Sequence, residues 1–499
     1  MKFSKLNFLL SIMFLVVAVS PAHTQCPPVY IFTGEAKGDQ FGISVASAGD
    51  VNNDGFDDLI VGAWLNDAGG TWAGRAYVFS GQNGDTIYVF TGEAAGDNLG
   101  FSVSGAGDVN NDGFDDLIVG APHNDAGGFQ AGRAYVFSGK TGDTIYIFTG
   151  VGALDLFGRS VASAGDVNND GFDDLIVGAI LSDAGGSFAG RADVFSGQTG
   201  DTIYVFTGET SGDDFGGSVA SAGDVNNDGF DDLIVGAIFN DAGGNNAGRA
   251  YVFSGQTGDT LFVFTGEAAE DRFGISVGTD GDVNNDGFAD LIVGASMNDA
   301  GGTDAGRAYV FSGQTGDTLY VFTGEAGGDR FGQSVASAGD VNNDGFDDII
   351  VGAHRNDAGG TGAGRAYVFS GKTGETIYIF SGETEFDGYG KSVSSAGDVN
   401  NDGFDDLIVG AGGGPGGRTF VFPGDCCCIG IRGDVNGDGN DANILDLTFI
   451  VDFIFRGSGD SGPCSVEGDL NADGNSSNIL DLTFLVDRIF RSGPAPGPC

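Results

Sequence analysis

The sequence predicts an all-β protein, a seven-bladed β-propeller with four strands in each blade, followed by a small α-helical calcium-binding domain. The first observation is a repeat, because Gly-Asp-Val-Asn-Asn-Asp-Gly-Phe occurs seven times at intervals of 58 residues. Units of this length are too short to bury a core alone, so they must stack or close into a ring. Each unit also carries four strand-length apolar runs, and an extra run precedes the first unit.

The four runs of each unit are rich in Val, Ile, Phe and Tyr and are separated by clusters of Gly, Asp and Asn, which favour turns. In the first unit we expect strands at residues 41–46, 58–63, 76–79 and 87–90. Four strands per unit are typical of a propeller blade. No long stretch of this region has helical apolar spacing, so a helical or leucine-rich solenoid is disfavoured and an open β-solenoid is the alternative.

The two ends of the repeat array favour a closed ring. A run at residues 29–34 precedes the first unit, whereas the seventh unit ends after the run at 418–422 and lacks its fourth strand. We expect the first run to complete the last blade, because this pairing removes two open sheet edges. The propeller is therefore predicted to span residues 25–424.

The N-terminus has the pattern of a secretory signal. Lys2 and Lys5 precede an apolar stretch at residues 8–19, and small residues follow around Ser20 and Ala22. We expect residues 1–24 to be a signal peptide and the mature protein to be secreted or held at the cell surface. An uncleaved anchor is the alternative, although the apolar stretch is short for a membrane span.

The charge of the chain is strongly negative, with 70 acidic and 21 basic residues and a net charge of −49. Four motif positions, those of Asp50, Asp54, Asp57 and Asp58, supply 27 of these acids over the seven repeats, because one copy has Ala289 instead. The acids are thus concentrated at fixed places. Nucleic acid and anionic membranes are excluded as partners, since both require clustered Lys or Arg.

Oxygen-bearing side chains alternate along the motif Asp50-x-Asn52-x-Asp54-Gly55-x-x-Asp58. Hard oxygen ligands at this spacing, with the carbonyl of Phe56 and a Gly for the sharp turn, favour Ca²⁺ over Mg²⁺, zinc or copper. A solvated Asp/Asn/Gly turn is the alternative for one copy, but seven copies favour metal. The candidate ligands are Asp50, Asn52, Asp54, Phe56, Asp58, Asp108, Asn110, Asp112, Phe114, Asp116, Asp166, Asn168, Asp170, Phe172, Asp174, Asp224, Asn226, Asp228, Phe230, Asp232, Asp282, Asn284, Asp286, Phe288, Asp290, Asp340, Asn342, Asp344, Phe346, Asp348, Asp398, Asn400, Asp402, Phe404 and Asp406.

The fifth repeat indicates which acids are ligands. Ala289 replaces the Asp beside the closing Asp290, while the other ligand positions of that copy are retained. The Asp57 position is therefore not expected to bind metal. Crowded carboxylates repel one another, so we expect Ca²⁺ to be structural and to stabilise its blade.

The repeats resemble the FG-GAP repeats of the integrin α-subunit propeller. The characteristic elements are Phe41-Gly42 and Val61-Gly62-Ala63, with Gly120-Ala121-Pro122 in the second unit. The resemblance spans residues 29–424, and Leu99-Gly100 departs from it where Phe-Gly is expected. It implies that the calcium loops lie on one face of the propeller and that ligands bind on the opposite face.

The opposite face is where the repeats differ. The varying pairs include Trp64-Leu65, Pro122-His123 and His354-Arg355, with Trp72, Phe129 and Phe188 nearby. Exposed aromatics here would form a contact surface for an extracellular protein or a glycan. Unconstrained loop variation, or packing between blades, is the alternative.

Residues 433–499 form a second predicted domain, with two related loops that each lead into a helix, at 448–455 and 483–490. The pair resembles a type I dockerin, which implies two bound Ca²⁺ and docking onto a cohesin module that tethers the protein. The loops are longer than in that family, and Ile444-Leu445 stands where polar recognition residues are expected. A self-contained calcium domain packed on the propeller is the alternative. The candidate ligands are Asp434, Asn436, Asp438, Asn443, Asp446, Asp469, Asn471, Asp473, Asn478 and Asp481.

Six cysteines in an exported chain favour disulfides. Residues 425–432 form a linker that contains Cys426, Cys427 and Cys428. If the first strand closes the last blade, Cys26 comes near this cluster, and a covalent clasp follows as a hypothesis. The pairing of Cys464 and Cys499 stays open.

No catalytic residue is expected. Histidine is scarce, no Ser-His-Asp or Gly-x-Ser-x-Gly arrangement stands out, and the repeated acids are assigned to metal. The sequence therefore predicts an adhesion or recognition module. The alternative is an accessory protein or glycoside hydrolase of extracellular polysaccharide degradation, because dockerin-bearing proteins are often of that class.

Overall fold

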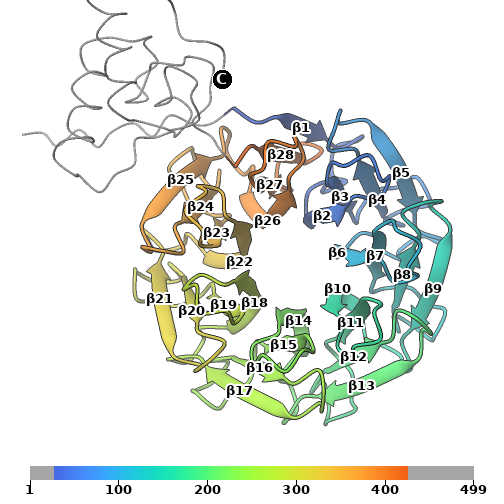
Figure 1. Cartoon of the computed structure of the whole chain (residues 1–499), viewed down its shortest axis with the longest axis horizontal. Helices are drawn as coiled ribbons and strands as arrows, with labels where there is room; N and C mark the ends of the chain where they lie inside the picture. The colour runs from blue at the N-terminus through green and yellow to red at the C-terminus, as the bar shows by residue number, and fades with distance from the viewer. Residues whose placement is uncertain (1–26, 425–499) are drawn as a thin grey trace, which may run out of the picture.

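The computed structural model describes residues 27–424 as seven four-stranded antiparallel sheets arranged around a central axis (Figure 1). The last blade packs against the first, so the ring is closed and the predicted propeller is confirmed over an open solenoid. No helix among the described residues is long and apolar enough to cross a membrane. The predicted signal peptide, cysteine linker and second calcium domain, including the ligands Asp434–Asp481, lie outside the described residues.

Each blade runs outward from an innermost strand at the axis. Blade 1 contains β2 (Val45–Gly49), β3 (Asp58–Ala63), β4 (Arg75–Phe79) and β5 (Thr86–Thr91), and blade 2 contains β6 (Val103–Gly107), β7 (Asp116–Ala121), β8 (Arg133–Phe137) and β9 (Thr144–Thr149). Blade 3 contains β10 (Phe157–Gly165), β11 (Asp174–Ala179), β12 (Arg191–Phe195) and β13 (Thr202–Thr207), and blade 4 contains β14 (Phe215–Gly223), β15 (Asp232–Ala237), β16 (Arg249–Phe253) and β17 (Thr260–Thr265). Blade 5 contains β18 (Phe273–Gly281), β19 (Asp290–Ala295), β20 (Arg307–Phe311) and β21 (Thr318–Thr323), and blade 6 contains β22 (Phe331–Gly339), β23 (Asp348–Ala353), β24 (Arg365–Phe369) and β25 (Thr376–Ser381). Blade 7 contains β26 (Tyr389–Gly397), β27 (Asp406–Ala411), β28 (Arg418–Phe422) and β1 (Tyr30–Thr33).

The innermost strand of blade 1 differs from the expectation of a strand at residues 41–46. It runs from Val45 to Gly49, and Phe41 forms only an isolated bridge with Gly417. The chain is irregular after the Phe-Gly pair or its equivalent in every blade: Gly42 has a φ of +82° and the equivalent Gly158 has +85°, although β10 begins at Phe157. In blade 3 the register shifts between Phe157 and Ser160 at the same place, which is the mark of a β-bulge.

The hydrophobic core lies between the blades. The second strand of every blade is buried along its whole length, as in β3. Ile60 and Val78 of blade 1 pack with Val103, Leu117 and Val119 of blade 2 in one cluster. Burying a side chain of this size contributes about 1.5–3 kcal/mol, so each blade depends on both neighbours for its stability.

A ring of seven hydrogen bonds joins the innermost strands around the axis. The backbone N–H of Val103 donates to Ser44 Oγ of the preceding blade, and the equivalent pair recurs at every junction with lengths of 3.0–3.1 Å. The last bond, from Val45 to Ser392 Oγ, closes the ring between blades 7 and 1. These bonds fix the residues beside Ser44 and its equivalents at the axis.

The N-terminal strand closes the last blade, as predicted. β1 pairs antiparallel with β28, with Phe32 opposite Thr419. It also contacts blade 1, because Phe32 stacks on Phe79 with 4.1 Å between ring centroids, and the Tyr30 hydroxyl donates to the carbonyl of Gly81. One strand thus holds the first and last blades together.

The closing strand gives a test at single N–H groups. The N–H of Gly34 donates to the carbonyl of Gly417, and bonded pairs alternate along an antiparallel ladder, so the N–H of Phe32 faces β28 and that of Ile31 faces away. We expect Phe32→Pro to lower the free energy of unfolding by about 1–3 kcal/mol more than Phe32→Ala does, because Thr419 loses a partner. Denaturant unfolding measures this difference.

The positional control is Ile31→Pro, which removes an N–H that points to solvent. We expect this variant to unfold close to wild type, since proline is tolerated on the free side of an edge strand. Equal destabilisation by Pro at positions 31 and 32 would contradict the observed register.

Candidate functional site

The seven Asp-rich loops connect the innermost strand of each blade to its second strand, and they all lie on one face. In the first loop the carboxylate of Asp50 accepts hydrogen bonds from the N–H groups of Asp54 (3.0 Å) and Gly55 (2.8 Å). Asn53 and Gly55 have positive φ angles of 56° and 87°, which turn the chain sharply. The same pair of bonds recurs in the other six loops.

The closing aspartate of each loop is buried. Asp58 begins β3 with no exposed surface, and its carboxylate accepts hydrogen bonds from the N–H of Gly81 (3.0 Å) and from Asn52 Nδ2 (3.0 Å). Burial raises the pKa of Asp58 to about 7 against the lowering effect of the Gly81 bond, and the charges of Asp54 and Asp50 raise it further. Each loop therefore holds a buried carboxyl group beside two further carboxylates.

The donor set of each loop fits Ca²⁺, since it offers hard oxygens and excess negative charge around one buried carboxylate. The loop brings Asn52 and Asp58 into direct contact, whereas Asp50 and Asp54 bond the loop backbone, Asp54 through the N–H of Phe56 (3.1 Å). Within residues 27–424, no three Asp, Glu, His or Cys side chains converge closely enough to hold an ion. Ca²⁺ at these loops stays a prediction from the sequence.

The position beside the closing aspartate has a role that sequence analysis missed. Asp115 of blade 2 accepts a hydrogen bond from the backbone N–H of Asp50 in blade 1 (2.8 Å). Counting this bond, the same contact joins six pairs of neighbouring blades: five of the bonds are 2.8–3.0 Å long, and in the sixth the backbone N–H of Asp340 donates to the carboxylate of Asp405. These bonds link the Asp-rich loops into an almost complete circle.

The junction between blades 4 and 5 lacks this bond, because Ala289 stands where the carboxylate is required. The Cβ of Ala289 lies beside Gly223. In blade 1 the carboxylate of Asp115 lies beside Gly49, the residue that corresponds to Gly223. Six aspartates in seven repeats were the sequence signal for this role. Only the contacts between neighbouring repeats, which a single repeat does not contain, show what the carboxylate binds.

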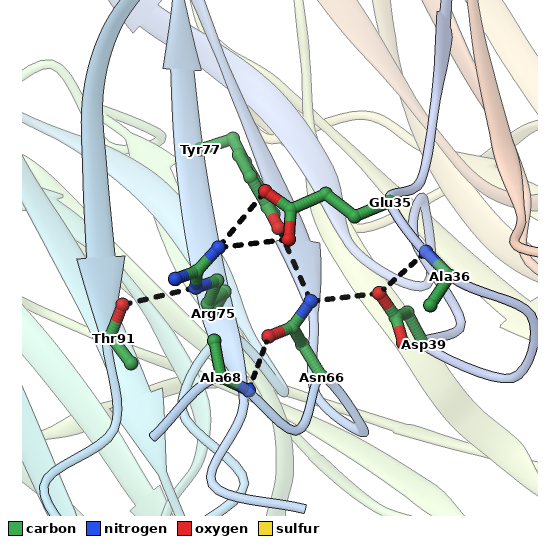
Figure 2. A network of polar contacts seen from close by, with 8 residues as sticks. All are labelled: Glu35, Ala36, Asp39, Asn66, Ala68, Arg75, Tyr77 and Thr91. Atoms are coloured by element: carbon green, nitrogen blue, oxygen red, sulfur yellow. Dashed lines mark hydrogen bonds and ion pairs between the residues drawn. The ribbon is translucent and has the colours of Figure 1, made fainter. Parts of the chain in front are cut away.

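The opposite face carries a second repeated network, which Figure 2 shows for blade 1. Arg75 donates to both carboxylate oxygens of Glu35 at 2.9 Å, and Asn66 Nδ2 donates to Asp39 Oδ2 at 2.7 Å and to the Tyr77 hydroxyl at 3.3 Å. The first arginine of the third strand is ion-paired in all seven blades: Arg75–Glu35, Arg133–Glu93, Arg191–Asp193, Arg249–Glu209, Arg307–Glu267, Arg365–Glu325 and Arg418–Asp387. Six of these pairs hold a loop of this face to the sheet, whereas Arg191 and Asp193 both belong to β12.

The structure divides the variable aromatics predicted on this face into two groups. Trp64 packs between blades, with its ring 5.1 Å from that of Phe101 and its indole N–H bonded to Gln40. Trp72, Phe129 and Phe188 are exposed by 57%, 63% and 46%. Trp64 therefore packs between blades, whereas Trp72, Phe129 and Phe188 are exposed and can contact a ligand.

The FG-GAP repeat model matches residues 41–79, 99–137, 157–195, 215–253, 273–311, 331–369 and 389–422. Integrin alpha-5 of Xenopus laevis is 34% identical over 216 residues, which is 40% of this chain and 20% of that protein. Integrin alpha-V of Gallus gallus is 31% identical over 235 residues, 44% of this chain and 22% of that protein. The chain thus spans about a fifth of the length of the curated relatives it matches.

The carboxylate bond between blades gives a prediction for Asp173, which accepts the N–H of Asp108 at 3.0 Å. We expect Asp173→Ala to lower the free energy of unfolding by about 1–3 kcal/mol, because the N–H is left without a partner. Asp173→Asn keeps an acceptor oxygen and removes repulsion from Asp115 and Asp231, so we expect no loss of stability. Chemical denaturation of both variants measures the difference, and equal losses would contradict the assigned role.

Proposed function

The chain belongs to the FG-GAP repeat family, and on that premise we propose that it is a calcium-stabilised recognition module that binds an extracellular ligand. The ligand contacts the propeller face opposite the Asp-rich loops. The observation that carries this proposal is the division of the ring into two faces. One face repeats the same acidic loop seven times, whereas the other varies from blade to blade and exposes aromatic side chains.

Calcium has a structural role in this proposal. The side chains of Asp50, Asn52, Asp54 and Asp58, with the carbonyl of Phe56, would hold one ion in blade 1, and the equivalent residues would do so in the other blades. A bound cation supplies positive charge that offsets the repulsion among the loop carboxylates. The high pKa of the buried Asp58 supports this role, because burial without a counter-charge disfavours its ionised form.

The binding face is suited to recognition because its exposed aromatics are carried on loops that the sheets hold in place. Trp72 and Phe129 follow buried second strands of blades 1 and 2, and Phe386 precedes β26 with 63% of its surface exposed. Large exposed aromatics on one face are typical of contact surfaces rather than of plain loops. Protein or glycan ligands both fit this chemistry.

Location and attachment complete the proposal. The similarity to integrin α chains supports an extracellular or cell-surface site of action. The dockerin-like residues 433–499 would tether the module to a cohesin-type partner or a surface scaffold.

The function is tested by screening the mature chain against arrays of extracellular proteins and glycans in the presence of Ca²⁺. For a ligand found in this way, we expect Trp72→Ala with Phe129→Ala to weaken binding at least about tenfold, as loss of central aromatic contacts does. The matched control is Val89→Ala with Val205→Ala, since these valines are 43% and 47% exposed on outer strands. Release of new reducing ends from a glycan would instead support the polysaccharide-degrading alternative.

Calcium binding gives a separate prediction by titration calorimetry of chelator-stripped protein. We expect nine sites in the full chain, seven in the propeller and two in residues 433–499, and a melting temperature that rises with Ca²⁺. One site at a free concentration of 100 Kd stabilises the folded state by about 2.7 kcal/mol.

The variant Asp170→Ala removes a carboxylate from the loop of blade 3, and we expect it to bind one ion fewer than wild type. Asp173→Asn, three positions along the same loop, is the control and retains the wild-type number. A melting temperature that does not respond to Ca²⁺ would overturn the structural role.

A further inference from the structure

Most basic residues of the propeller have an evident structural partner. Fifteen of the 21 Lys and Arg residues lie within residues 27–424, and seven of these are the paired arginines at the start of the third strands. Lys140 and Lys372 lie over the rings of Phe114 and Phe346 on the face of the Asp-rich loops. Lys37 lies in a loop, which leaves five cations to explain.

These five, which we call the cationic cluster, are Arg159, Arg272, Arg330, Arg355 and Lys391. All five lie at one end of the blades, opposite the Asp-rich loops. Arg159 and Lys391 lie within the irregular starts of β10 and β26, Arg272 and Arg330 directly precede β18 and β22, and Arg355 follows β23. The innermost strands line the axis (Figure 1), so at this end of the blades the cationic cluster lies around the mouth of the ring.

The charges of the cluster act on one another across the axis. Burial lowers the pKa of Lys391, and the charges of Arg159, Arg355 and Arg330 lower it further. Arg159 belongs to blade 3 and Lys391 to blade 7, which are not neighbours, and both lie on innermost strands, which line the axis. Burial lowers the pKa of His354 to about 3, and the charges of Lys391, Arg355 and Arg330 contribute to this lowering.

The cluster has few partners within the protein. Arg330 pairs with Asp304 at 3.3 Å, but the other four cations form no salt bridge within the part of the chain that the structure describes. Arg159 lies over the Phe101 ring at 4.1 Å and Arg272 over the Phe239 ring at 5.2 Å.

Buried nitrogen atoms at the cluster are also without partners. These are Nε of Arg272 and of Arg330 and Nδ1 of His123 and of His354. Buried polar atoms are rarely left unpaired because this is destabilising, so four of them around this end of the ring call for an explanation such as a bound partner. Asp214 is the acid beside Arg159. Burial raises the pKa of Asp214 to about 6, although the charge of Arg159 acts to lower it.

We propose that the cationic cluster binds an acidic side chain of a peptide segment in the protein ligand of this face. The inference rests on the proposed function and names the ligand's chemistry. A guanidinium group pairs with a carboxylate through two parallel hydrogen bonds, and several fixed cations at the axis would hold one or two carboxylates. The ligand thus supplies negative charge in addition to that of Asp214 and Asp304.

The rest of the surface favours a short acidic peptide over a long polyanion. The net charge of the chain is −49, so an extended polyanion that reaches beyond the cluster is repelled by the surrounding acids. The same face exposes Trp72, Phe129, Val151 and Phe386, with Val151 exposed by 75%. Aliphatic and aromatic surface of this kind buries apolar side chains of a peptide that flank its acidic residue.

The experiment uses the full chain in Ca²⁺ and a fluorescein-labelled peptide of alternating Glu and Phe, with a Gln/Phe peptide and polygalacturonate as further probes. Fluorescence anisotropy is measured for wild type and for the double variant Arg159→Gln with Lys391→Gln. We expect the Glu/Phe peptide to bind wild type, to bind the double variant about tenfold or more weakly, and to lose affinity as salt is added. The Gln/Phe peptide is expected not to bind.

The matched control is Lys140→Gln with Lys372→Gln, which makes the same change in net charge on the opposite face and is expected to leave binding unchanged. The melting temperature of each variant shows that it is folded, and removal of like charges at the axis is not expected to lower it. Equal affinity of wild type and the Arg159/Lys391 variant for the Glu/Phe peptide would overturn the proposal, as would tighter binding of polygalacturonate. If a ligand from the array screen binds wild type and the Arg159/Lys391 variant equally well, the proposed role of the cationic cluster is overturned, but the proposed recognition function is not.

Discussion

Burial of both faces of every sheet against its neighbours is the constraint on which the rest of the structure depends. Ile60 of blade 1 shares a cluster with Leu117 of blade 2, so no blade has a complete core of its own. Hydrogen bonds also join neighbouring blades. These are the bond between Ser44 and Val103 with its equivalents, and the bonds of Asp115 and the equivalent carboxylates. At the two ends of the repeat array, β1 buries the open edges by completing blade 7 and contacting blade 1. Closure therefore stabilises every unit at once.

Antiparallel pairing within each blade separates the two kinds of chemistry. Connections after the first and third strands emerge on one face, and connections after the second and fourth emerge on the other. Positions that repeat in every blade, such as Asp58 and Arg75, bond the backbone or a fixed partner and maintain the fold. Positions that vary, such as Arg159 and Trp72, do not form these repeated bonds. Specificity is therefore expected where the repeats differ.

Sequence reasoning succeeded where the information lies within one repeat or in the number of repeats. The strand at Asp58–Ala63, the seven blades and the closing role of β1 all follow from period, apolar runs and the unequal ends. It was wrong about the strand at residues 41–46, because the innermost strand of blade 1 starts at Val45 and Phe41 forms only an isolated bridge with Gly417. It missed the role of Asp115 and the convergence of Arg159 with Lys391, since both arise between blades. The ligand positions of the Asp-rich loops stay predictions.

The absence of a carboxylate at Ala289 has a mechanical consequence. Asn53, Asn169, Asn285 and Asn401 each donate to a glycine carbonyl of the next blade, whereas Asn111, Asn227 and Asn343 form no such bond among the described residues. Of these three, only Asn227 lies at a junction where the carboxylate bond is missing as well, that of blades 4 and 5. That junction thus lacks two of the polar links found between blades 1 and 2. A ring under tension parts at its least-bonded joint, so a pull on the two ends of the chain that undoes β1 would next separate the propeller into a group of four blades and a group of three.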